Sequence, residues 1–332
     1  MRLSESISKN IMEVSTGGIL NRFKIKTRRS VLFFEDIFAN YIKECEKNGF
    51  EKDTFEIGEK WGNIGIQVFM KDILKRLPHS TIFYLTNSIW KNLNLVDEIV
   101  IKESGEKIEG WTKNEFVTRI IGKNLFIAGY YSGCLHGLIG KNTELLSIER
   151  SGEYYIYKSV VKGPTIPVKT KSLATYIELN KIKESKGFSL KEALNSNIFR
   201  LNENNILLFR ERNILIIENT LFHLLGNGPC LDKLPKISFN FFRQTTEKSD
   251  TEEKINFLKN LLQIMGWGNV HVVIDGNKLT FIIKNPPYGL QIEKDNWEFI
   301  ARVILGYLWT IKKNYKLKKI ENKHDLIIYF SA

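Results

Sequence analysis

The chain has 332 residues, of which 43% are apolar and 26% are charged, close to ordinary globular usage. This composition excludes extensive disorder and fibrous repeats, and three cysteines are too few for a disulfide scaffold. The net charge of +12 suits nucleic acid, an acidic lipid surface or an acidic partner, and by itself selects none of them.

Two features of the chain concern its compartment. No apolar stretch of the signal-peptide kind follows Met1, so we expect a cytoplasmic protein with reduced thiols. The longest weakly polar run, 126–139, is shorter than the roughly 20 residues that a membrane-spanning helix needs. We therefore expect no membrane span.

The positive charge is concentrated in three stretches, which carry +5 (residues 1–30), +5 (160–200) and +4 (311–332). The densest part, 22–29, alternates basic and apolar residues as a strand with one basic face does. Such a stripe would suit an anion or nucleic acid, and a solvated strand face is the alternative. The candidate binding residues are Arg22, Lys24, Lys26, Arg28 and Arg29.

The second half of the chain repeats the first with slowly drifting spacing, which indicates a tandem duplication. Matching segments occur in the same order, and the offset between their residue numbers drifts from 183 to 173 and then to 172. We divide the chain into a first copy with the basic N-terminal segment (1–160), a basic helical linker (161–198) and a second copy (199–332). The matching segments include 29–35 with 212–218, 99–101 with 272–274, 126–128 with 299–301, and 156–157 with 328–329.

Apolar periodicity and turn residues predict the same α+β order of elements in each copy, with helices packed on one face of an antiparallel sheet. A hairpin with a glycine turn is predicted in the middle of each copy, at Ser104-Gly105 and at Asp275-Gly276. The predicted helices are 30–46, 60–76, 80–93 and 113–141 in the first copy, and 212–225, a shortened 236–243, 251–265 and 292–314 in the second. The predicted closing hairpins are 144–159 and 315–330.

The linker contains two capping-box patterns, 175–178 and 189–192, each of which favours the start of a helix. Two short helices with a turn at Gly187 are also typical of a helix-turn-helix, and this segment is basic. We favour a helical connector between the copies, with a DNA-binding helix-turn-helix as the alternative.

Three glycines and several reactive side chains are candidate sites. Gly129, Gly133 and Gly137 recur every four residues and share one helix face. We predict that this face packs closely on a neighbouring element, and a ligand lying over it is the alternative. The histidines and cysteines are isolated in the sequence, so we predict no metal site, no cofactor and no catalytic residues.

One motif favours an enzyme. Asn285-Pro286-Pro287-Tyr288 resembles the segment with which amino-group methyltransferases hold the target nitrogen, and 224–229 resembles a weak cofactor-binding glycine loop. The acidic residue expected before such a loop is absent, and the corresponding part of the first copy has no such motif. A proline pair that simply ends a strand is the alternative, and we favour it.

The order of helices, middle hairpin, small-residue helix and closing hairpin is similar to the 4-vinyl-reductase-type domain, whose fold is shared by subunits of the TRAPP vesicle-tethering complex. The likeness rests on 61–65, 126–140, 261–268 and the glutamates Glu149 and Glu321. The resemblance implies binding, because members sense small apolar or aromatic effectors, serve in bacteriochlorophyll synthesis or form assembly surfaces. Several hold zinc through cysteines near the closing hairpin, where this chain has none, so we expect no such zinc site.

These observations predict a non-enzymatic regulatory or scaffolding protein whose two copies pair as an intrachain pseudo-dimer. The pair would bind a small apolar ligand, a partner protein or both, through residues that the sequence does not identify. One alternative is a nucleic-acid-binding transcriptional regulator that uses the stripe at 22–29 and the basic linker. The other alternative is an amino-group methyltransferase.

Overall fold

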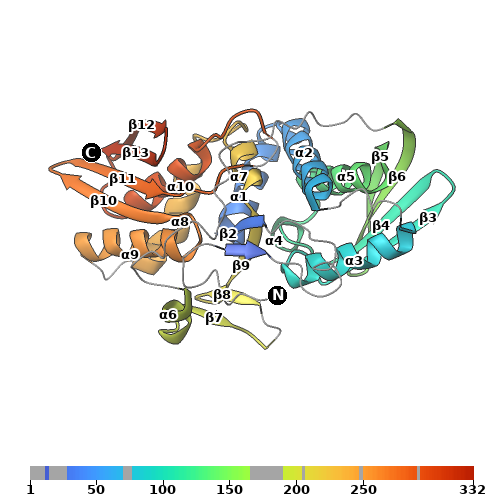
Figure 1. Ribbon diagram of the computed structural model, residues 1–332, viewed down its shortest axis with the longest axis horizontal. Helices are drawn as coiled ribbons and strands as arrows, with labels where there is room; N and C mark the ends of the chain where they lie inside the picture. The colour runs from blue at the N-terminus through green and yellow to red at the C-terminus, as the bar shows by residue number, and fades with distance from the viewer. Residues whose placement is uncertain are drawn as a thin grey trace.

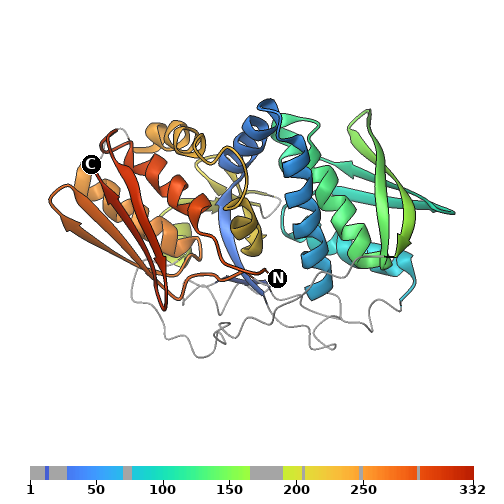
Figure 2. The same ribbon diagram turned by 90° about the horizontal axis from the view of Figure 1, so that it is seen from above.

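The structure is a computed structural model, and it describes residues 12–14, 28–69, 77–164, 190–203, 206–246, 250–289 and 292–332. Two four-stranded antiparallel sheets lie at opposite ends of the molecule, with the helices between them around a central sheet (Figures 1 and 2). Among the described helices, none is both long enough and apolar enough to cross a lipid bilayer.

Apart from α4, which has no counterpart among the described elements of the second copy, the elements of the two copies follow the same order along the chain. The first copy consists of β2 (Arg28–Phe34), α1 (Glu35–Lys47), α2 (Glu51–Phe69), α3 (His79–Asn92), β3 (Glu98–Ser104), β4 (Lys107–Lys113), α4 (Thr118–Ile121), α5 (Leu125–Ile139), β5 (Lys141–Ser151) and β6 (Tyr154–Pro164). The second consists of β9 (Arg212–Glu218), α7 (Thr220–Leu225), α8 (Leu234–Thr246), α9 (Thr251–Ile264), β10 (Asn269–Asp275), β11 (Lys278–Lys284), α10 (Glu298–Leu308), β12 (Lys316–Asn322) and β13 (Leu326–Ser331). The remaining elements are β1 (Met12–Val14), α6 (Leu190–Asn195), β7 (Phe199–Leu201) and β8 (Leu207–Phe209).

The predicted fold class is confirmed by the sheet topology. The strand order is β3-β4-β6-β5 in the first copy and β10-β11-β13-β12 in the second, so the two chain paths are the same. The helices of each copy lie on the inner face of its sheet (Figure 2). Both copies therefore have helices on one face of an antiparallel sheet, as the sequence predicts.

A β-bulge strengthens the case for duplication. In the closing hairpin of the first copy the register shifts between Leu145 and Ser147, and in the second it shifts between Leu317 and Lys319. The extra residues, Leu146 and Lys318, are equivalent at the offset of 172 that relates the closing hairpins in the sequence. Because a bulge is a specific local irregularity, its recurrence at equivalent positions indicates common descent.

One proposed segment match is displaced by two positions. The middle hairpins begin at Glu98 and Asn269, an offset of 171, whereas matching 99–101 with 272–274 assumes an offset of 173. A shift of two positions keeps each side chain on the same face of a strand. The alternation of apolar residues therefore could not reveal the displacement.

Two predicted helices begin instead with strands. Residues 30–34 belong to β2 and residues 212–218 to β9, so the predictions of helices over 30–46 and 212–225 are wrong at their starts. Val31 to Phe34 form a continuous apolar run in which every side chain is at most 2% exposed. A strand buried on both faces has no alternation, and periodicity cannot distinguish it from a buried helix.

Other helix boundaries differ from prediction by several residues. The helix predicted at 60–76 is α2, which begins well before that range, at Glu51, and the region 113–141 contains two helices. The break between α4 and α5 includes Gly122, whose φ of 78° lies in the left-handed region that favours glycine. In the second copy, α8 is longer than the predicted 236–243, and α10 is shorter than 292–314.

The central sheet joins the copies about a pseudo-two-fold axis. β2 and β9 pair antiparallel, with Leu32 opposite Ile216 and Phe33 opposite Leu215. At the offset of 183 found for these strands, Leu215 and Ile216 are the counterparts of Leu32 and Phe33, so each contact recurs with the copies exchanged. This reciprocal pattern is the signature of a self-complementary two-fold interface.

The hydrophobic core is continuous across the two copies. The ring of Phe33 lies 4.7 Å from that of Phe222, and the ring of Phe34 lies 4.6 Å from that of Phe241. Thus β2 of the first copy packs against α7 and α8 of the second. In the predicted linker, α6 begins at Leu190, directly after the first residue of the second capping-box pattern, whereas 165–189 lie outside the described residues.

Candidate anion-binding groove between the two copies

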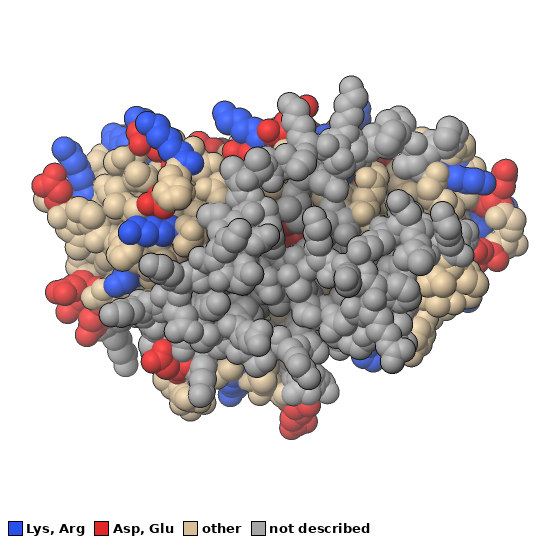
Figure 3. Space-filling view, in the orientation of Figure 1, with Lys and Arg blue, Asp and Glu red and all other residues tan. Residues whose placement is uncertain are grey.

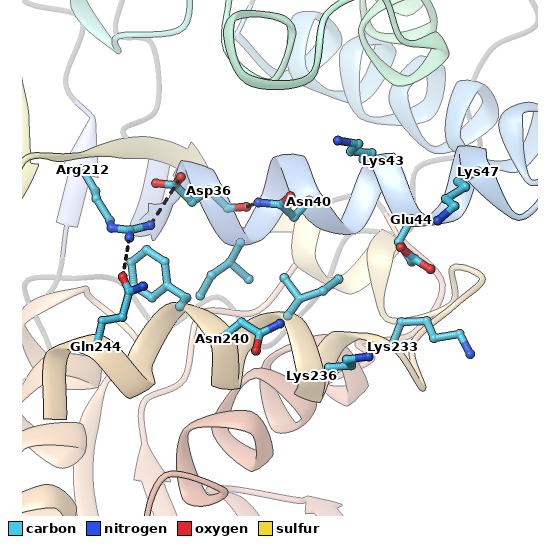
Figure 4. A pocket seen from close by; sticks show the side chains of 13 residues that line it. Asp36, Asn40, Lys43, Glu44, Lys47, Arg212, Lys233, Lys236, Asn240 and Gln244 are labelled. Atoms are coloured by element: carbon cyan, nitrogen blue, oxygen red, sulfur yellow. Dashed lines mark hydrogen bonds and ion pairs between the residues drawn. The ribbon is translucent and has the colours of Figure 1, made fainter. Parts of the chain in front are cut away.

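An open groove of about 610 Å³ runs between α1 of the first copy and α8 of the second (Figure 4). We call it the interface groove. Its lining residues are Asp36, Ile37, Asn40, Lys43, Glu44 and Lys47 from α1, Arg212 from β9, and Lys233, Lys236, Ile237, Asn240, Phe241 and Gln244 from α8 and the residue before it.

Helical periodicity explains why these residues meet. Residues three and four apart share a helix face, and both walls of the groove follow that spacing. Ile37 and Phe241 are buried at the floor, because the same faces hold the two helices together. The charged and amide side chains therefore form the rim.

The groove carries more positive than negative charge. Lys43, Lys47, Lys233, Lys236 and Arg212 oppose two carboxylates, which leaves a net charge of +3. Lys43, Lys47 and Lys236 are exposed. On the face shown in Figure 3, lysine and arginine are mixed with acidic residues among the coloured atoms.

Contacts fix one end of the groove. Arg212 lies 3.6 Å from Asp36, donates to the side chain of Gln244 at 3.1 Å and stacks over Phe241 at 4.9 Å (Figure 4). This end is therefore electrically balanced and preorganised. At the other end, Glu44 points from α1 toward Lys233 and Lys236. Lys233 also pairs with Asp232 at 3.0 Å, so the excess positive charge here comes from Lys236 together with Lys43 and Lys47.

The sequence-predicted basic stripe is only partly described. Arg22, Lys24 and Lys26 lie outside the described residues, and Arg28 and Arg29 form the first residues of β2. Their backbone pairs with β1, where Arg29 lies opposite Glu13. Anion binding by the stripe stays a prediction.

Sequence reasoning missed the groove because its two walls belong to different copies and lie far apart in the chain. The available signal was the pair of lysines at helical spacing in each wall, 43 with 47 and 233 with 236. Nothing in the sequence alone showed that these two helix faces meet. That information resides in the pairing of β2 with β9, which was itself predicted as helix.

The glycine face of α5 packs against α2, as predicted. A Cβ atom at Gly129 or Gly133 would overlap the backbone carbonyls of Phe55 and Glu59, and one at Gly137 would overlap Ile66. On α2, Gly58 and four residues later Gly62 meet α5 in the same way. The alternative of a ligand lying over this face is therefore wrong.

The segment that resembles a methyltransferase motif follows β11 and is held by internal contacts. His223 Nε2 lies 2.9 Å from the carbonyl oxygen of Pro287, and Asn219 donates to the carbonyl of Tyr288. His223 Nδ1 lies 3.2 Å from the N–H and 3.1 Å from the carbonyl oxygen of Asn296, and Nε2 also lies 3.3 Å from the carboxylate of Asp295. These contacts give the proline segment a structural role, and methyltransfer stays an untested alternative.

A polar cluster that sequence reasoning missed lies between α5, α2 and β5. His136 Nδ1 is 3.6 Å from Glu59 Oε1, and Nε2 is 3.1 Å from the carbonyl oxygen of Thr143. Ser132 Oγ is 3.4 Å from Nε2, an arrangement that superficially resembles a hydrolase triad. The Ser132 hydroxyl donates instead to Glu59 Oε1 at 3.3 Å, and Nε2 faces a backbone carbonyl, so the contacts differ from those of a hydrolase triad.

The second copy repeats the helix-to-strand contact of this cluster. Trp309 Nε1 donates to the carbonyl oxygen of Tyr315 at 3.0 Å, and the sequence offsets make these two residues the equivalents of His136 and Thr143. Recurrence in both copies indicates a structural contact that joins the helix end to the closing hairpin. Among the described residues, no group of three or more histidine, cysteine or acidic side chains is placed to hold a metal ion.

Comparison with protein-family models, curated proteins and solved structures gives no match to this chain. The similarity to the 4-vinyl-reductase and TRAPP-like domains therefore stays a prediction from the sequence.

Proposed function

We propose that this chain is a non-enzymatic scaffolding or regulatory protein that binds an acidic segment of a partner protein in the interface groove. The observation that carries the proposal is the set of cations that both copies contribute to one groove. Because its two walls come from different copies, the complete groove requires the intrachain pseudo-dimer.

The lining chemistry favours a peptide. Ile237, the partly exposed apolar residue of the floor, offers a contact for apolar side chains, whereas the exposed Asn40 and Asn240 offer amide groups suited to a peptide backbone. The two carboxylates of the groove would oppose a continuous run of phosphates. A segment that alternates acidic and apolar residues satisfies both the floor and the rim.

The difference between the copies explains why the groove forms on the α1 side. α1 has 13 residues and α7, its counterpart, has only 6. The groove cations Lys43 and Lys47 come from the turns of α1 that α7 lacks. Loss of these turns in the second copy therefore leaves the pseudo-symmetric position without an equivalent wall.

The test is fluorescence anisotropy with a labelled peptide in which glutamate and leucine alternate. We expect binding that weakens with added salt, and no binding of the matched peptide in which glutamine replaces glutamate. The double variant Lys233→Glu/Lys236→Glu should bind roughly tenfold more weakly or worse.

The matched control is Lys107→Glu/Lys278→Glu, which makes the same charge change at exposed ends of the two middle hairpins. It should bind like the unaltered protein. If both double variants bind the peptide equally weakly, the loss of affinity reflects only the change in net charge. That result would refute a binding site in the groove. Absence of binding at low salt would refute the proposal directly.

Nucleic-acid binding is the second candidate, because residues 1–30 and 160–200 each carry a charge of +5. Anisotropy with a labelled duplex and a labelled single strand tests it under the same conditions. A steep fall in affinity with salt, sensitive to Arg22→Glu/Lys24→Glu and insensitive to Lys233→Glu/Lys236→Glu, would favour the stripe over the groove.

A further inference from the structure

Two cysteines from different copies lie together beside the interface groove. Cys45 is in α1 and Cys230 is in the segment between α7 and α8. The sulfur of Cys45 is 3.6 Å from the carbonyl oxygen of Pro229, the residue before Cys230, and the two thiols are near enough for each to influence the pKa of the other. The two cysteines lie far apart along the chain, and the pairing of the two copies brings them together.

The surrounding contacts hold both thiols in place. Tyr41, one turn before Cys45, donates its hydroxyl to the same Pro229 carbonyl at 2.6 Å. Gly228 packs against the Tyr41 hydroxyl, and the Cys230 carbonyl accepts the N–H of Lys233 at 2.9 Å. The backbone before Cys230 is therefore held against α1, and the turn after it is closed by a local hydrogen bond.

We infer that Cys45 and Cys230 form a redox-active dithiol that closes to a disulfide between the two copies in the presence of a glutathione-type disulfide. The inference goes beyond the proposed function and does not depend on it. It assigns a modification site, with a low-molecular-weight disulfide as the co-reactant.

The exposure of the two residues sets the order of the steps. Cys230 is partly exposed, so its thiolate attacks one sulfur of oxidised glutathione, and one glutathione leaves as a thiolate. The buried Cys45 thiolate then attacks the Cys230 sulfur and releases the second glutathione. The two cysteine protons pass to the two glutathione thiolates, so two thiols are oxidised and one disulfide is reduced.

Burial raises the pKa of both the Cys45 and the Cys230 thiol. The reacting thiolate is therefore scarce at neutral pH, and the reaction should accelerate as the pH rises. Cys134 provides an internal comparison, since it is buried within α5 and burial also raises its pKa. Because it lies in α5 rather than at the contact between the copies, it should remain a free thiol.

The position of the pair connects it to the groove. Glu44 and Lys47 flank Cys45 on α1, and Lys233 follows Cys230 by three residues. A disulfide would fix α1 to the start of α8 at the end of the groove where the cations are in excess.

The experiment uses the reduced full-length protein incubated with oxidised glutathione, alkylated under denaturing conditions and analysed by mass spectrometry and peptide mapping. The expected product lacks two hydrogen atoms, carries no glutathione, contains a Cys45–Cys230 cross-linked peptide and is alkylated at Cys134. The variant Cys134→Ser should give the same cross-link. Cys45→Ala should keep glutathione bound to Cys230, and Cys230→Ala should form neither product.

If a variant does not fold, the products formed by the unaltered protein still test the inference. Glutathione retained on Cys230 without a cross-link would overturn it, because Cys45 would then be unable to reach the Cys230 sulfur. Three alkylated thiols after prolonged incubation at alkaline pH, or a cross-link involving Cys134, would overturn it as well.

Discussion

The helix pair of the first copy and that of the second show how one architecture has been packed in two ways. In the first copy, α2 and α5 approach through glycines on both helices, including Gly62 and Gly133. In the second, α8 and α10 meet at Gly306, the counterpart of Gly133, and Ser238 donates to the carbonyl of Val303 at 2.7 Å. The shared glycine marks the point of closest approach, and the remaining contacts have diverged around it.

A second difference follows the first strand of each copy. Glu35 and Glu218 occupy equivalent positions, since each ends its matching segment, 29–35 or 212–218. Glu35 is fully buried and receives two hydrogen bonds from Arg119, at 2.5 and 2.7 Å. Glu218 instead accepts the hydroxyl and the N–H of Thr220, two residues later. The carboxylate at this position therefore links elements that are distant in the sequence in the first copy, and it stabilises a local turn in the second.

The first prediction concerns this pair of glutamates. Glu35→Gln should lower the free energy of unfolding by about 3–5 kcal/mol, because it leaves the guanidinium of Arg119 buried without its counter-charge. Glu218→Gln should cost only about 1 kcal/mol, because a glutamine oxygen still accepts from Thr220. Urea unfolding of both variants measures the two values.

The double variant Glu35→Gln/Arg119→Met is the control for the ion pair. Removing the unpaired cation should recover much of the lost stability. Equal costs for the two single variants would contradict the difference between the copies. The carboxylate of Glu35 also accepts the N–H of Val117, a β-branched residue with φ of 64°, so part of the cost comes from this strained turn.

The second prediction concerns Glu115, another buried glutamate of the first copy. Burial raises the pKa of Glu115 to about 7, and the hydroxyl of Tyr157 donates to its carboxyl group. The folded state therefore holds a proton that the unfolded chain, with an ordinary glutamate pKa, releases. The contribution to stability is complete below about pH 4.5 and is lost as the pH rises to about 7, a change of about 3 kcal/mol.

Glu115→Gln should remove this pH dependence, because the amide resembles the neutral acid. Urea unfolding across the same pH range gives the free energy of unfolding of both proteins. The difference between the two curves cancels the contributions of the other titrating groups. The equivalent part of the second copy is Pro286, Pro287 and Tyr288, and it supplies no acid there. Parallel pH profiles for the two proteins would show that Glu115 is ionised in the folded state.

The sequence predicted what depends on local chemistry. The turn at Asp275-Gly276 placed β10 and β11 correctly, and helical periodicity found α9 within one residue of its end. It failed where tertiary packing decides. The apolar run from Val31 to Phe34 is a strand because β9 pairs with it, and the meeting of α1 with α8 depends on that pairing. The groove and the cysteine pair were therefore beyond reach, since both are products of the contact between copies.

The third prediction tests the glycine contacts of the first copy. A Cβ atom at Gly133 would overlap the backbone of Glu59, which cannot move without separating the helices. Gly133→Ala should therefore cost about 1–3 kcal/mol, even though alanine favours the helix. Gly65→Ala on α2 is the matched control, because the space beside it is open, and it should stabilise the protein by about 0.5–1 kcal/mol. Stabilisation by both substitutions would disprove the close packing.

The last prediction concerns the start of the helix that carries those glycines. Asn124 caps α5 by accepting the N–H of Ile127 at 2.9 Å, whereas Trp297, its counterpart in the second copy, makes no side-chain cap. In the second copy the preceding residue, Asn296, accepts the N–H of Glu298 at 2.9 Å, so the cap has moved by one position.

Asn124→Ala should lower the free energy of unfolding by about 1 kcal/mol, and Asn124→Ser should recover most of it because serine keeps an acceptor at the cap. Urea unfolding resolves the two variants, and hydrogen exchange at the first turn of α5 reports the local effect. If alanine and serine behave alike, the loss arises from the bond that Asn124 donates to Thr118 at 3.0 Å rather than from the cap. The two copies would then differ in how the loop before α5 or α10 is anchored, and the first turns of these two helices would be equally stable.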